Sequence, residues 1–153
     1  MNRRDFMVTG VGLGMLAAGP ALADKKTSGV AAKAQAQTPR DAVVATTSDC
    51  EQKGALCSAH CADELAKGNA AMAHCAESVE EMRAFVQAML TLAARGSAMA
   101  KKLAPLCAEA CKSCADACLE HKAHWEHGMH LACKSCMEAC LACEKACNAY
   151  VAA

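Results

Sequence analysis

Small and apolar residues recur every three or four positions along four stretches of this chain, and polar residues fill the positions between them. This spacing is typical of amphipathic helices whose apolar faces pack together. The first stretch begins at Thr38-Pro39-Arg40-Asp41, where Thr is suited to cap a helix and Pro to occupy its first position. We therefore expect the first helix to start here and to run to Lys67.

Glycines separate the four stretches, as expected where helices end and the backbone must turn. The remaining helices are predicted over Ala70 to Arg95, Ala98 to about Gly128 with a bend or restart at Pro105, and Met129 to Tyr150. Gly68, Gly96 and Gly128 mark the turns. Four helices of similar length with short turns predict an all-α fold, an antiparallel up-down-up-down four-helix bundle.

The first residues are typical of a targeting segment. Arg3 and Arg4, followed by Phe6, a short glycine-rich apolar run and Ala21-Leu22-Ala23, resemble a cleavable twin-arginine export signal. We expect residues 1–23 to be this signal, 24–37 a flexible leader and 38–153 the bundle domain. The apolar run is too short for a stable membrane span, although an uncleaved anchor is the alternative. The predicted location is the periplasm or the lumen of an internal membrane.

The charge and composition of the chain argue against one class of function, nucleic-acid binding. The 16 basic residues balance the 16 acidic ones, and aromatic residues make up 3% of the chain. A nucleic-acid-binding protein normally has a basic excess, and single-strand binders need aromatic stacking platforms. We therefore expect no nucleic-acid partner.

Cysteines occupy the seam positions where a bundle normally holds Leu, Ile or Val. The chain has 13 of them: Cys50, Cys57 and Cys61 on the first predicted helix, Cys75 on the second, Cys107, Cys111, Cys114 and Cys118 on the third, and Cys133, Cys136, Cys140, Cys143 and Cys147 on the fourth. The segment 110–118 is repeated at 132–140 with seven of nine residues identical. The sequence therefore predicts a bundle interior lined with thiols.

Several interpretations of these thiols compete. Buried Cys can be a small hydrophobe, but Leu would pack a core far better. A disulfide-stapled structural protein is a second interpretation, although the count is odd and cysteines on one helix face are poorly placed to bridge each other. An iron–sulfur electron-transfer protein is a third, but the spacing differs from the ferredoxin run. Zinc sites usually draw on clustered loop residues, which are absent from this pattern.

Cu(I) suits a continuous stripe of thiols, because thiolate is a soft ligand that this ion prefers. If each ion takes two sulfurs and each sulfur bridges two ions, the capacity is about one Cu(I) per Cys, or about 13 ions. The 13 cysteines are thus the predicted metal ligands, and copper is the predicted cargo.

The Cys-x3-Cys and Cys-x2-Cys steps from Cys107 to Cys118 and from Cys133 to Cys147 resemble the bacterial Cys-lined four-helix-bundle copper storage proteins. The resemblance covers about Thr38 to Tyr150 and extends to the exported, twin-arginine branch of the family. It implies storage of many Cu(I) ions without catalysis, later supply to a copper acceptor or copper enzyme, and assembly of bundles into a homo-oligomer. The chain departs from an unbroken pattern at Gly54, where a further Cys could sit.

Histidines gather at one predicted end of the bundle. The turns after the first and third helices lie at the same end, and they bring together His60, Met72, His74, His121, His124, His127, Met129 and His130. His60 lies between Cys57 and Cys61, and Met72 lies one turn before Cys75, so both are predicted as ligands at the mouth of the bundle. His121, His124 and His127 are either ligands or solvated residues at a helix end.

Overall fold

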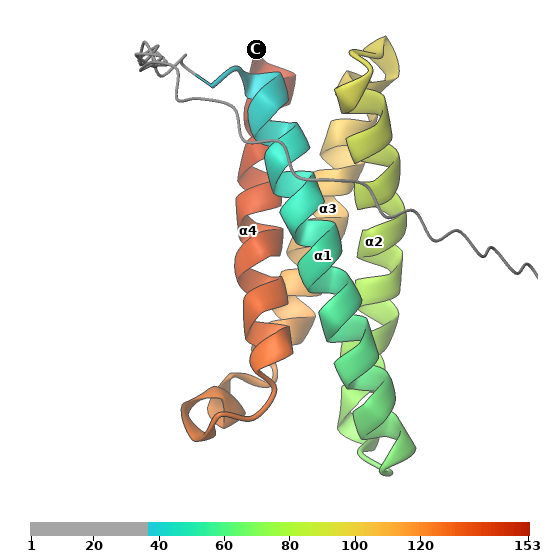
Figure 1. Ribbon diagram of the computed structural model, residues 1–153, viewed down its shortest axis with the longest axis vertical. Helices are drawn as coiled ribbons and strands as arrows, with labels where there is room; N and C mark the ends of the chain where they lie inside the picture. Colours follow the sequence, from blue (N-terminus) through green and yellow to red (C-terminus); the bar gives the residue numbers. More distant parts are fainter. Residues whose placement is uncertain (1–36) are drawn as a thin grey trace, which may run out of the picture. The chain divides into compact units, whose positions relative to one another are not determined.

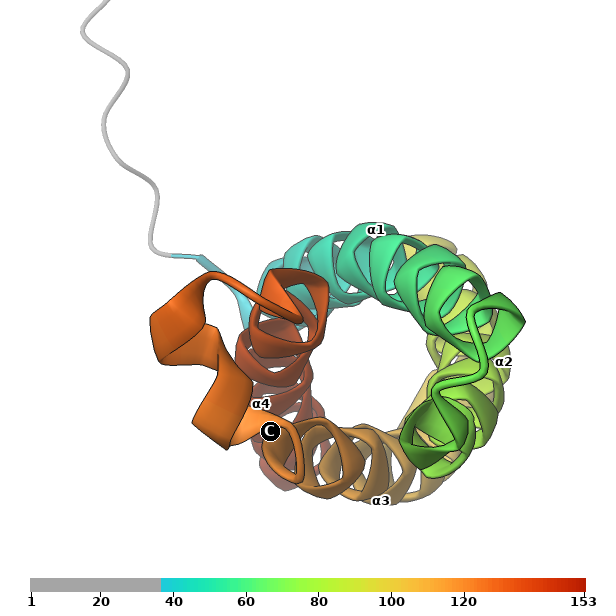
Figure 2. The ribbon, with the colours of Figure 1, turned by 90° about the horizontal axis from the view of Figure 1, so that it is seen from below.

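The computed structural model describes residues 37–153 and confirms an all-α bundle of four long helices. The helices alternate in direction (Figure 1) and are α1 Pro39–Ala66, α2 Ala73–Ala94, α3 Ala98–Leu119 and α4 Leu131–Ala152. Two short 3₁₀ helices, η1 Ala70–Met72 and η2 Lys122–His127, lie in the turns after α1 and α3. Each long helix packs against two others, so that the four form a closed ring seen end-on in Figure 2.

The predicted signal, residues 1–23, lies outside the described residues, as does the predicted leader apart from Gln37. Within the part that is described, no helix combines the length and apolar character needed to cross a membrane.

The helix starts follow from local side chains. The Thr38 hydroxyl accepts a hydrogen bond from the Asp41 amide at 3.1 Å, and the Asp41 carboxylate accepts one from the Thr38 amide at 3.3 Å. This reciprocal arrangement satisfies amides that have no partner inside the helix. At α3, the Ser97 hydroxyl accepts from the Met99 amide at 3.2 Å. The predicted start of the first helix is therefore confirmed.

The three turn glycines all adopt left-handed backbone conformations, with φ of 87° at Gly68, 66° at Gly96 and 72° at Gly128. A side chain is strained at such φ values, and glycine is not. After α1, the Asn69 amide reaches back to the Glu64 carbonyl at 3.0 Å, which satisfies an otherwise unpaired carbonyl of the last turn. The predicted turn positions are confirmed.

The third helix is shorter than predicted. It runs through Pro105 as a single helix but ends at Leu119, and the chain continues as η2 instead of as α-helix to Gly128. Cys118 is the last thiol of the seam on α3, and no residue of η2 is buried, so the following turns have no apolar stripe to pack against the core and hold them in α-helix. The fourth helix accordingly begins at Leu131, after His130 has turned the chain with φ of 52°.

The two ends of the bundle core differ in chemistry. At the end farther from the η1 and η2 turns the core contains no thiol among the described residues and is filled by Val43, Met89, Ala93, Ala104 and Tyr150. We call this the apolar end. The opposite end, where η1 and η2 lie (Figure 1), carries the histidines and is called the histidine end. The thiols lie between the two.

Candidate metal-binding core

All 13 cysteines are buried with no exposed surface, and together they form what we call the thiol core. α1 contributes three thiols, α2 one, α3 four and α4 five. The alternation of three- and four-residue steps keeps every thiol of a helix on the face that points inward. The prediction of a thiol-lined interior is therefore confirmed.

The sulfurs fall into five groups close enough to share a metal ion. Within each group all Sγ atoms lie within 4.8 Å of one another. The groups are Cys57–Cys61–Cys75–Cys133, Cys57–Cys118–Cys136, Cys114–Cys136–Cys140, Cys50–Cys111–Cys143 and Cys107–Cys143–Cys147. Every one of the 13 cysteines belongs to at least one group. No thiol of the core is therefore left isolated.

Three thiols belong to two groups each, so the groups connect. Cys57 and Cys136 join the first three groups in series, and Cys143 joins the other two. The two series meet where Cys50 and Cys140 bring their Sγ atoms to 3.7 Å. Sulfurs shared in this way can bridge two ions, so the core offers one continuous row of sites along the bundle axis.

The spacing of neighbouring sulfurs suits coordination by two or three thiolates. Cys75 and Cys118 bring their Sγ atoms to 3.6 Å, and the sulfurs of Cys114 and Cys136 lie 3.8 Å apart. With a metal–thiolate bond of about 2.3 Å, two ligands at trigonal angles lie about 4.0 Å apart and two at opposite ends about 4.6 Å apart. Small rotamer changes would therefore bring these sulfurs to the separation of two thiolates bound to one metal ion.

Thiolate formation is shared unevenly within the core. A hydrogen bond from Cys118 lowers the pKa of Cys75 and that of Cys133 to about 4 in each case. The pKa of Cys118 itself is raised, because its hydrogen bonds, first to Cys114, hold its proton and burial disfavours the charge. Thiolates near the histidine end are thus stabilised by neighbouring thiols that keep their protons.

A thioether joins the thiols near Cys50. The Met82 sulfur lies 3.5 Å from the Cys50 sulfur, and Met82 is fully buried on α2. Gly54 makes room for it, because a Cβ at this position would lie 2.9 Å from the Met82 methyl and 3.0 Å from Cγ of Arg83. Met82 thus fills the space where the sequence suggested a further thiol at position 54. The sequence pattern alone did not predict this contact between Met82 and the thiols.

The predicted mouth residues lie at the histidine end. His60 is partly buried on α1, and its Nε2 lies 2.8 Å from Nδ1 of His130 in a hydrogen bond between the two rings. Met72, at the end of η1, is fully buried. His74 instead pairs with Glu120 at 2.8 Å on the bundle exterior.

Of the three histidines that the sequence left open, His121 is buried, whereas His124 and His127 are exposed. The rings of His121 and His124 lie 5.5 Å and 5.2 Å from the ring of His130, between centroids. The helix pattern predicted these histidines at one end, but it did not predict the burial of His121 or the left-handed turn at His130, because both depend on the path of the chain around η2. Burial, together with the charge of His60, lowers the pKa of His130 below its ordinary value.

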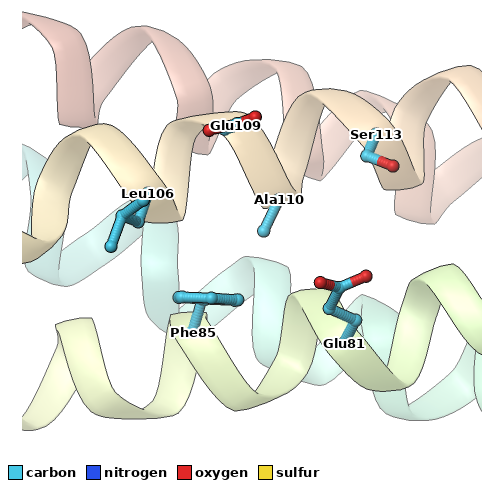
Figure 3. A pocket seen from close by; sticks show the side chains of 6 residues that line it. All are labelled: Glu81, Phe85, Leu106, Glu109, Ala110 and Ser113. Atoms are coloured by element: carbon cyan, nitrogen blue, oxygen red, sulfur yellow. The ribbon is translucent and has the colours of Figure 1, made fainter.

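Three grooves on the outside of the bundle contain no thiol, and a single histidine, His74, lines one of them. Figure 3 shows one of about 300 Å³ between α2 and α3, lined by Phe85, Leu106, Glu81, Glu109, Ala110 and Ser113. No cysteine or histidine lines it. The side chains suited to binding a soft metal ion therefore lie in the core and at the histidine end.

The interior of this bundle is suited to soft metal ions, because its buried thiols form a connected set of thiolate ligands. The sequence profile of the copper storage protein (Csp) family matches residues 35–152, and the chain belongs to this family. No curated protein sequence matches the chain. The family is one of storage proteins, and its cargo is copper.

Proposed function

We propose that this protein stores Cu(I) in its thiol core, at about one ion per cysteine, and releases it later to copper enzymes or other copper acceptors. The observation that carries this proposal is the connection of the five sulfur groups through shared thiols. Isolated tetrathiolate sites would hold about three ions in 13 thiols, whereas bridging sulfurs raise the capacity to about 13. In this role the protein binds and releases ions and catalyses no reaction.

Filling proceeds from the histidine end. His60 and Met72 lie there, and imidazole and thioether bind Cu(I) more weakly than thiolates do, so they can pass an ion inward without trapping it. The opposite end of the core is packed with apolar side chains that offer an ion few ligands. Export by the twin-arginine route, to the periplasm or an internal lumen, and assembly into a homo-oligomer complete the proposal.

The test is an anaerobic titration of the reduced protein with Cu(I) against a competing chelator. We expect a single large uptake that ends at about 13 ions per chain, with a colourless product. An end point near three ions would instead indicate discrete tetrathiolate sites and contradict the proposal. A brown protein after expression with iron would favour the iron–sulfur alternative.

A further inference from the structure

A thioether on α2 continues the inward-facing sulfurs of that helix beyond its one thiol. Met82 is fully buried and follows Cys75 by seven residues on α2. Seven residues are about two helical turns, so both side chains lie on the face of α2 that points inward. This helix therefore presents two sulfurs to the bundle interior, one as a thiol and one as a thioether.

Met82 lies beside the point where the two series of sulfur groups meet. The Cys50 thiol donates a hydrogen bond to the Met82 sulfur at 3.5 Å, so a lone pair of the thioether faces the sulfur of Cys50. The same Cys50 sulfur lies 3.7 Å from the sulfur of Cys140, which is the contact between the two series. An ion bound by Cys50 at this junction therefore has the thioether within reach.

The neighbouring helix α1 leaves room for this side chain. Gly54 takes the seam position four residues after Cys50 and three before Cys57, and it is buried. A glycine inside a helix costs about 0.5–1 kcal/mol relative to alanine. A Cβ at this position would lie 2.9 Å from the Met82 methyl. If Met82 only filled space, alanine here and a shorter residue on α2 would fill the same seam without this cost.

From these contacts we propose that Met82 is a copper ligand, the third ligand of one Cu(I) that Cys50 and a neighbouring thiolate hold at the junction of the two series. Thioether and thiolate are both soft ligands that select Cu(I). With metal–sulfur bonds of about 2.3 Å, two ligands of a trigonal site lie about 4.0 Å apart, so the 3.5 Å contact needs to open by about 0.5 Å. The ion takes the place of the Cys50 proton.

A thioether adds a ligand without adding charge. One Cu(I) for each of the 13 cysteines leaves the core neutral, because every thiolate carries one negative charge and every ion one positive charge. An uncompensated charge in a buried core is costly. Met82 therefore raises the coordination of this ion from two to three where a further thiolate would leave a net negative charge. Because a thioether holds the ion less tightly than a thiolate does, the junction can pass ions from one series to the other.

The test uses the full chain labelled with selenomethionine and filled with Cu(I), so this inference rests on the proposed function. X-ray absorption at the selenium edge reports directly whether copper is bonded to selenium. Met72→Leu is introduced first, because Met72 is the other predicted thioether ligand. We expect selenium in this background to have a copper neighbour at bonding distance, and a further Met82→Leu to remove it. The same change should speed the release of one ion to a chelator about tenfold and leave the capacity within about one ion of the parent.

Met89→Leu in the same background is the matched control. Met89 is also fully buried on α2, but it packs at the apolar end and makes no hydrogen bond with a sulfur of the described residues. Leu replaces Met in a core at modest cost, and circular dichroism checks that both variants are folded. A copper neighbour of selenium that survives Met82→Leu, or that Met89→Leu removes equally, would overturn the assignment. A chain that takes up about 13 ions without any selenium–copper bond refutes this inference alone, whereas a chain that takes up no Cu(I) refutes the proposed function as well.

Discussion

Removing the central thiols gives a quantitative test of bridging. Cys114, Cys118, Cys136 and Cys140 lie on α3 and α4 in the middle of the sulfur row and include every thiol of one group and two of another. Replacing these four by Ser keeps the side-chain shape but substitutes a hard hydroxyl that Cu(I) disfavours. Nine of the 13 cysteines then remain, because 13 less four is nine.

The structure also shows how the remaining nine divide. Cys57, Cys61, Cys75 and Cys133 stay together near the histidine end, and five others, Cys50, Cys107, Cys111, Cys143 and Cys147, stay together toward the apolar end. The sulfur of Cys50 loses its contact with the sulfur of Cys140, so no contact between thiols connects the two clusters. We therefore expect the capacity to fall by about four ions, to about nine, and uptake to separate into two phases.

The assay measures bound copper per chain after gel filtration, together with the titration curve and the circular dichroism of the copper-free protein. A matched control places four serines on the same helices at buried positions without thiols: Ala108, Ala115, Ala139 and Ala146. The control should stay near 13 ions if it remains helical. A folded four-Cys variant that still binds about 13 ions, or that loses nearly all of its copper, would refute one-to-one bridging.

Three further predictions test particular contacts. Gly54→Ala gains about 1 kcal/mol of helix propensity, but its Cβ would lie 2.9 Å from the Met82 methyl, so this side chain must shift. We expect urea unfolding to show a more favourable effect of Gly54→Ala in a Met82→Ala background than in the parent chain, and an equal effect in both would contradict the contact. Because the pKa of His130 is lower in the folded chain than in the unfolded one, the copper-free protein should lose stability as pH falls through about 6.5 toward that lowered pKa. Thermal unfolding across this pH range should show a weaker dependence of stability on pH for His130→Asn. The same dependence in the variant and the parent protein would show that His130 does not cause it. Replacing His60 and Met72 by Ala should slow loading in stopped-flow measurements with capacity nearly intact, and a loss of four or more ions would make them storage ligands.

Local sequence signals and the spacing of apolar residues predict the helix boundaries and the thiol core. The capping signal at Thr38 and the three turn glycines place the helix boundaries because each acts locally, through a hydrogen bond or a φ value that only its immediate neighbours determine. The thiol core follows from the regular alternation of three- and four-residue steps, because residues at this spacing lie on one face of a helix. The same spacing therefore predicts both the bundle and its cysteine-lined interior.

The histidine end could be predicted only in part. The sequence places the histidines at one end, but the helix pattern carried α3 on to Gly128 and gave no sign that His121 is buried or that His130 turns left-handed. The close approach of Met82 to Cys50 likewise depends on the missing side chain at Gly54 and on the packing of α2 against α1. Both features arise from tertiary contacts between distant segments, which periodicity does not encode.

The central claim is that copper occupies the thiol core, and anomalous diffraction from crystals of the Cu(I)-loaded protein tests it most directly. Data collected on both sides of the copper absorption edge locate each ion without reference to the protein ligands. We expect a row of about 13 peaks along the bundle axis, each between two or three of the 13 cysteine sulfurs, with neighbouring peaks sharing a sulfur. Peaks confined to surface histidines and carboxylates, or about three isolated peaks with four sulfurs each, would contradict storage by bridging thiolates.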